Sequence, residues 1–291
     1  MVEKLLVPVD FSGGSQSALN SVKEIVGVRE IVLLHVVYNR YPSANPAIVH
    51  PRVQEARAAL EEIKKGLVIP GAMITTLVEE ITGGEISEVI NRTAIRLGIS
   101  LVVMGRRGTG IIESLLLGSV ASDMLRYGKT DLLLIHSPPG YGQGNQDPGK
   151  PFQRLFSHAM VCTDFSEPEI ACICLDELPC IRKVTLFHAV TIGDSPEEVS
   201  SSVEASQAGL ERLQKAFARI SIPVQIHVSV GSAAEDIISF SEKEDISIII
   251  LKSTGKRGFL LNLIGSTTAR VARHAKKPVL VLRRSRAARH S

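Results

Sequence analysis

The chain has 291 residues, 44% of them hydrophobic, and this length favours about two domains that each bury a core of their own. Its 33 lysines and arginines against 30 acidic residues give a net charge of +3, which disfavours a general nucleic-acid role. No apolar run approaches the roughly 18 residues of a membrane span, and the first residues enter a strand pattern directly. We therefore expect no membrane span, no signal peptide and a cytoplasmic protein.

In the first half of the chain, short apolar runs alternate with amphipathic stretches. This alternation predicts a parallel sheet with helices on both faces. The expected strands are 3–9, 30–37, 72–79, 100–104 and 131–136. The expected helices are 13–27, 51–66, 84–97 and 117–127.

The second half repeats the pattern of the first. Its expected strands are 157–163, 182–190, 222–229, 246–251 and 278–283. Asp10 corresponds to Asp164 at an offset of 154 residues, and His35 corresponds to His188 at an offset of 153. A repeat this long indicates duplication of a whole domain. We expect domains at 1–137 and 153–284, a linker rich in glycine and proline at 138–152, and a basic tail at 285–291.

A glycine-spaced motif follows the fourth strand of each half. In the first half, Gly105-x2-Gly108 leads after nine residues to Gly118-Ser119. Glycines there let the backbone approach a phosphate, while N–H groups of Gly118, Ser119 and Val120 supply donors at a helix start. The pattern therefore predicts a phosphate-binding loop.

The second copy of the motif has Lys252 in the place of the leading glycine, although Gly255-x9-Gly265-Ser266 remains. Two interpretations follow. The lysine side chain obstructs the place where the backbone should approach phosphate, and the site is impaired. Alternatively its ammonium group binds the anion itself.

These motifs resemble the universal stress protein family, which carries G-x2-G-x9-G-[S/T] at this place. The family also has an acidic residue after its first strand and a hydrophobic residue at the end of its second. Asp10 and Val36 fill these places in the first half, and Asp164 and Ala189 in the second. The resemblance implies an adenine-nucleotide alpha hydrolase-like α/β fold: two doubly wound, five-stranded parallel sheets of order 3-2-1-4-5 in tandem.

The resemblance also implies binding of ATP or AMP, mainly in the first domain, with Mg²⁺ left open. Asp10 would contact the ribose. The implied nucleotide-binding residues of the first domain are Pro8, Val9, Asp10, Val36, Met104, Gly105, Arg107, Gly108, Gly118, Ser119 and Val120. Those of the second domain are Asp164, Gly255, Gly265 and Ser266. Because members are often dimeric, we expect a pseudo-dimer joined through strands 131–136 and 278–283, with a homodimer and an unidentified protein partner as further expectations.

Three other features bear on function. The segment Ser12-Gly13-Gly14-Ser15 resembles the phosphate loop of pyrophosphate-releasing ATP enzymes, but a helix N-terminus is favoured. His35 and His188 suit hydrogen-bonded structural roles, Arg106 suits either phosphate neutralisation or plain exposure, and neither a catalytic set nor a metal cluster is predicted. We expect a nucleotide-binding stress-response or regulatory protein; a slow ATPase, an adenylyl-transferring enzyme and a nucleotide-free scaffold are the alternatives.

Overall fold

The computed structural model describes residues 2–40, 49–106, 117–136, 155–166, 181–191, 195–217, 222–253 and 264–283. The chain divides into two compact units, one built mainly before residue 150 and the other mainly from residue 150 onward. The predicted linker 138–152 and tail 285–291 lie outside the described residues. The domain boundaries therefore stay predictions, as does the pseudo-dimer.

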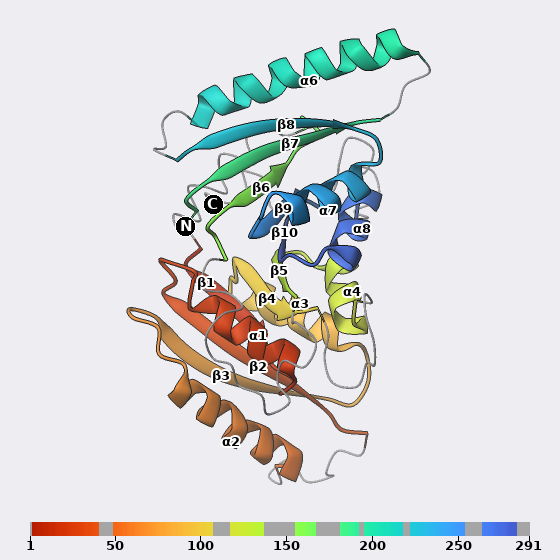
Figure 1. The fold of residues 1–291 in the computed structure, drawn as a ribbon. Coiled ribbons are helices and arrows are strands. Elements are labelled where there is room, and N and C mark those ends of the chain that lie inside the picture. The colour runs from red at the N-terminus through yellow and green to blue at the C-terminus, as the bar shows by residue number, and fades with distance from the viewer. Residues whose placement is uncertain are drawn as a thin grey trace. The chain divides into compact units, whose positions relative to one another are not determined.

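The sheet of the first unit consists of five parallel strands, and Figure 1 shows how the helices lie against it. The strands are β1 (Lys4–Pro8), β2 (Glu30–Tyr38), β3 (Met73–Ile81), β4 (Leu101–Gly105) and β5 (Asp131–Ile135). Their order is β3-β2-β1-β4-β5, with Leu5 of β1 in register with Ile31 and Leu101 of its two neighbours. β4 and β5 are buried along their whole length, as expected of strands covered on both faces. The predicted 3-2-1-4-5 sheet is confirmed.

The first unit has helices α1 (Gly13–Val22), α2 (Pro51–Gly66), α3 (Ile86–Arg96) and α4 (Ser119–Tyr127). Helix α1 packs against β1, β4 and β5, and α2 packs against β2 and β3. The prediction that α1 continues to residue 27 is wrong, because the helix ends at Val22 and Gly27 adopts a left-handed φ of 84°. Ile25 is still only 2% exposed, so the apolar pattern continues past the end of the helix.

The second unit repeats this topology. Its strands are β6 (Ala159–Cys162), β7 (Val184–Val190), β8 (Val224–Val230), β9 (Ile248–Lys252) and β10 (Val279–Leu282), in the order β10-β9-β6-β7-β8. Its described helices are α6 (Pro196–Ala216), α7 (Ala233–Lys243) and α8 (Ser266–His274). Helix α6 is capped by its preceding serine, since the Ser195 side chain accepts from the Glu198 N–H at 3.2 Å. Within the described ranges, no helix is both long and apolar enough to cross a bilayer.

In the second unit, three aromatic rings pack together, among them the imidazole of His227 of β8. The imidazole stacks on Phe187 of β7 at 5.4 Å between ring centroids and lies 4.3 Å from the ring of Phe240 of α7. Burial is the main cause that lowers the pKa of His227 below its ordinary 6.5. The folded unit therefore holds this imidazole in its neutral form more strongly than the unfolded chain does.

We expect His227→Phe to reduce the acid sensitivity of the second unit. The pKa of His227 is lower in the folded state than in the unfolded chain. The contribution of the neutral imidazole to folding stability is therefore complete above about pH 6.5 and is lost as the pH falls through the folded pKa. Phenylalanine keeps the aromatic packing and removes the titrating group. Urea unfolding at about pH 7.5 and pH 5.5 should show a smaller loss of stability for the variant, with hydrogen exchange of β7 and β8 locating the change. Equal losses in both proteins would contradict this role of His227.

Candidate functional site

The chain turns sharply between β1 and α1 at Asp10-Phe11-Ser12. The Asp10 Oδ1 atom accepts hydrogen bonds from the Ser12 backbone N–H at 3.0 Å and from the Ser12 hydroxyl at 2.5 Å. Ser12 in turn caps α1, because its Oγ accepts from the Ser15 N–H at 3.2 Å. The helix N-terminus interpretation of this serine-glycine segment is thus confirmed.

The end of β4 lies directly against the first turn of α1. A Cβ atom added to Gly105 would come within 2.5 Å of the Gly14 carbonyl oxygen and 2.8 Å of the Gly14 Cα atom. Only a residue without a side chain fits here unless α1 moves. Gly105 therefore has a structural reason for its identity that the motif alone did not predict: it allows two backbones to meet.

Helix α4 begins at the same edge of the sheet. Its N-cap residue is Gly118, whose N–H donates to the Arg106 carbonyl at 2.8 Å. The expectation that Gly118 offers its N–H to phosphate is therefore wrong. The N–H groups of Ser119, Val120 and Ala121 belong to the first turn, where a helix supplies no acceptor of its own, and no side chain of the described residues caps them. This open helix start favours an anion.

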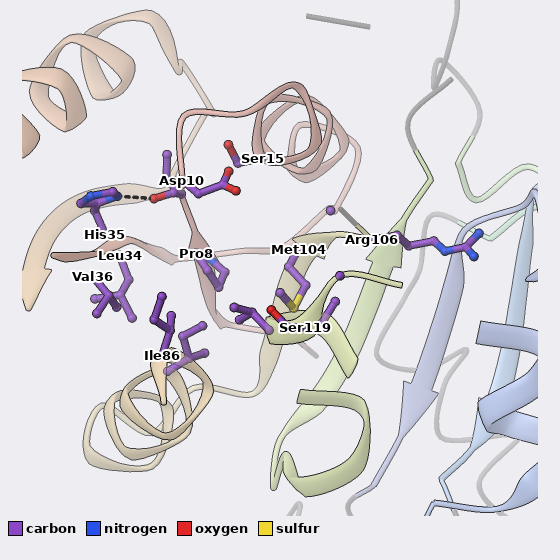
Figure 2. A pocket seen from close by; sticks show the side chains of 16 residues that line it. Pro8, Asp10, Ser15, Leu34, His35, Val36, Ile86, Met104, Arg106 and Ser119 are labelled. Atoms are coloured by element: carbon purple, nitrogen blue, oxygen red, sulfur yellow. Dashed lines mark hydrogen bonds between the residues drawn. The ribbon is translucent and has the colours of Figure 1, made fainter. Parts of the chain in front are cut away.

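These elements enclose a cavity of about 290 Å³ (Figure 2). Nine of the eleven residues predicted for the first unit line it: Pro8, Val9, Asp10, Val36, Met104, Gly105, Gly118, Ser119 and Val120. The other two, Arg107 and Gly108, lie outside the described residues. One edge of the sheet thus gathers residues that are as far as 112 positions apart in the chain.

Six further lining residues were not predicted for the site: Ser15, Leu34, His35, Ile86, Ile90 and Ala121. Arg106, for which the sequence leaves open both phosphate neutralisation and plain exposure, also borders the cavity. Ile86 and Ile90 lie one helical turn apart at the start of α3 and extend an apolar wall. These two isoleucines could have been predicted from the 3-2-1-4-5 strand order, because this order brings the start of the helix after β3 to the same edge of the sheet.

Arg106 borders the cavity without directing its guanidinium toward Asp10 or Ser119. Its side chain points away from Asp10 and Ser119 in Figure 2. The residue is 4% exposed, and its guanidinium lies 3.3 Å from Nδ1 of His136. The hypothesis that the Arg106 side chain neutralises phosphate finds no support in this arrangement.

The lining of the cavity separates into an apolar part and a polar part. Pro8, Leu34, Val36, Ile86 and Ile90 form the apolar part, and Val36 and Ile86 lie on the same side of Pro8 in Figure 2. The polar part includes the Asp10 carboxylate, the Ser15 and Ser119 side chains and the open start of α4. A ligand with a flat apolar group, hydroxyl groups and an anionic end matches this division.

The second unit keeps part of this arrangement. Asp164 Oδ1 accepts from the Ser166 N–H at 3.0 Å and from its hydroxyl at 2.6 Å, as Asp10 does in the first unit. Gly265 caps α8, which begins at Ser266, and its N–H donates to the Ser253 carbonyl at 2.7 Å. Gly255 lies outside the described residues. The glycine-to-serine start of the last helix is therefore reproduced in both units.

Three substitutions distinguish the corresponding region of the second unit. Lys252 stands at the position of Gly105, and the alignment of the aspartates places Pro168 at the position of Gly14, so both members of the glycine pair change together. Cys162 stands at the position of Pro8, and burial raises the pKa of its thiol far above the ordinary value. The thiol is therefore protonated and poorly nucleophilic at neutral pH.

Each unit is thus a doubly wound α/β domain, and the cavity of the first unit lies at the carboxyl edge of its strands, the usual place for ligands in this class of fold. The model of the universal stress protein family matches residues 1–136 and 182–283, and the chain belongs to that family. A universal stress protein of Mycolicibacterium smegmatis is 26% identical over 96% of both chains.

Solved structures agree on the fold. A universal stress protein from Archaeoglobus fulgidus superposes with a TM-score of 0.65 at 21% identity, covering 99% of this chain and 98% of its own. A putative universal stress protein from Pseudomonas aeruginosa superposes with a TM-score of 0.66 at 16% identity, covering 97% of this chain and 93% of its own. The fold of this chain, with its two units, therefore matches nearly the full length of both solved structures.

We expect Gly105→Ala to destabilise the first unit by roughly 1–3 kcal/mol, because the new methyl group forces α1 away from β4. Gly66→Ala is the matched control, since a Cβ atom there meets nothing within 4 Å. Urea unfolding should separate the two variants clearly. If both variants unfolded at the same urea concentration as the unaltered protein, the close approach of α1 to β4 would not constrain the fold.

Proposed function

We propose that the protein is a cytoplasmic, adenine-nucleotide-binding regulatory protein of the stress response that binds ATP or AMP mainly in its first unit. The observation that carries this proposal is the cavity of about 290 Å³, in which an apolar wall, a carboxylate and an uncapped helix start converge. Adenine would lie against Val36 and Ile86, Asp10 would accept from ribose hydroxyls, and the N–H groups that begin α4 would receive phosphate oxygens.

The charge of the described lining is compatible with a nucleotide. Asp10 is the single carboxylate among the described lining residues. The described lining therefore contains no cluster of carboxylates that would repel phosphate. No group of three or more His, Cys, Asp or Glu that could hold a metal ion is found among the described residues. Any Mg²⁺ that accompanies ATP would therefore be held mainly by the phosphates and water.

The second unit is the weaker candidate for binding. Besides Lys252, it has smaller side chains along the apolar wall: Ala189 stands at the place of Val36, and Ala233 begins α7 where Ile86 begins α3. Each lost side-chain carbon removes apolar contact area from a base. We infer that this unit contributes mainly to assembly or to contact with a protein partner.

Calorimetric titration with ATP and with AMP should therefore give one nucleotide per chain. Gly118→Val should weaken binding at least tenfold, because its side chain crowds the start of α4 beside the cavity. Gly265→Val makes the same change in the second unit and should leave the affinity unaltered. Two equal sites, or equal losses in the two variants, would contradict binding mainly in the first unit.

The same preparation distinguishes the alternative functions. Nucleotide released on denaturation identifies what the protein carries, and incubation with ATP then shows whether it is consumed. Bound ATP that stays intact supports a regulatory role, whereas steady release of ADP or of AMP indicates an enzyme. A protein that binds neither nucleotide would be an interaction scaffold.

A further inference from the structure

Both units contain the same strained turn beside a histidine. Phe11 and Phe165, which follow the site aspartates, adopt left-handed φ angles of 62° and 60°. Each phenylalanine ring lies 4.6 Å, between centroids, from the imidazole of the histidine on the neighbouring strand, His35 or His188. A bulky residue rarely adopts this backbone conformation, and it persists only where its surroundings hold it.

The histidine contributes a hydrogen bond as well as a ring. Nδ1 of His35 lies 2.6 Å from the Val9 carbonyl oxygen, and Nδ1 of His188 lies 2.7 Å from the Thr163 carbonyl oxygen. A carbonyl oxygen only accepts, so Nδ1 carries the proton in both units. The bond joins β2 to the residue directly before Asp10 (Figure 2). The predicted structural role of both histidines is confirmed.

Burial of the phenylalanine cannot account for the strain. The Phe11 side chain remains 44% exposed, so its apolar gain is incomplete. What the strained turn does achieve is a fixed direction for Asp10. Both hydrogen bonds from Ser12 end on Oδ1 of this carboxylate, and Oδ2 has no partner within the described residues. The turn therefore holds one carboxylate oxygen and leaves the other to the cavity that Asp10 lines.

We propose that the Phe11–His35 pair positions Asp10, so that the carboxylate is already oriented for the ribose hydroxyls before a nucleotide arrives. His35 is a positioning residue that acts through Asp10, although it also borders the cavity. This inference rests on the proposed nucleotide binding. It adds a determinant of affinity that the glycine motif does not contain.

A double-mutant cycle tests the inference. Affinity for ATP is measured by calorimetry for the unaltered protein, Asp10→Ala, His35→Leu and the double variant. Loss of a hydrogen bond to a charged group should weaken binding by about tenfold to a hundredfold in Asp10→Ala. His35→Leu should lose a large part of that factor, and the double variant should bind no more weakly than Asp10→Ala. Multiplied losses in the double variant would mean that His35 acts independently of Asp10, and the inference would fail.

A modified ligand separates positioning from a general loss of structure. 2′,3′-Dideoxy-ATP lacks the hydroxyl groups that Asp10 would bind, so His35→Leu should weaken binding of ATP but not of this analogue. Equal weakening for both ligands would overturn the inference. His35→Asn serves as the second variant, because its amide nitrogen can replace Nδ1 as donor to the Val9 carbonyl, and it should recover most of the affinity for ATP.

His188→Leu is the matched control in the second unit. It removes the same hydrogen bond and ring contact, so its effect on stability should resemble that of His35→Leu while affinity for ATP stays unaltered. If the unaltered protein bound no ATP, both the proposed function and this inference would fall. If Asp10→Ala weakened binding and His35→Leu did not, only the positioning role would be wrong.

Discussion

The site of the first unit depends on the direct contact between the end of β4 and the start of α1. With no side chain at Gly105, the first turn of α1 lies against the backbone of β4 around Gly14. This contact keeps the β1–α1 turn, and Asp10 with it, beside the residues that follow β4. The carbonyl oxygen of Arg106, the residue after β4, accepts a hydrogen bond from the Gly118 N–H. Helix α4 therefore also begins beside the end of β4. These two contacts therefore hold the carboxylate and the start of α4 at the same edge of the sheet.

For the proposed ligand, burial of apolar surface would contribute at least as much binding free energy as the charge at the start of α4. A helix start attracts an anion by about 0.3–1 kcal/mol when exposed, and by up to about 2 kcal/mol when partly buried. Removing about 100 Å² of apolar ligand surface from water contributes about 2.5 kcal/mol. The apolar wall formed by Val36, Ile86 and Ile90 thus matters at least as much as the helix dipole. The alanines at two of these places are therefore part of the reason, beside Lys252, for proposing that nucleotide binds mainly in the first unit.

Much of the fold could be predicted from the sequence, because most strands are short apolar runs. The duplication helps as well, since each strand of the first half has a counterpart in the second half. The site was predictable where the residues are adjacent to a motif, as at Asp10 and Ser119. The end of α1 was not, because Ile25 continues the apolar pattern after the helix has ended. The direction of Arg106 and the meeting of Gly105 with Gly14 were not predictable either, since both depend on how distant segments pack.

The duplication separates what the fold needs from what a ligand needs. The second unit keeps the aspartate, the strained phenylalanine and the histidine, and it closes the loop before α8 with the same hydrogen bond. It changes the glycine pair and the apolar wall. Asp164 therefore still performs the task that Oδ1 performs in Asp10, which is to hold the turn into the next helix. The task proposed for Oδ2, to receive a ligand, also needs the apolar wall beside it, where the second unit has alanine in place of Val36 and Ile86. A residue present in both copies can thus have one role in the second unit and two in the first.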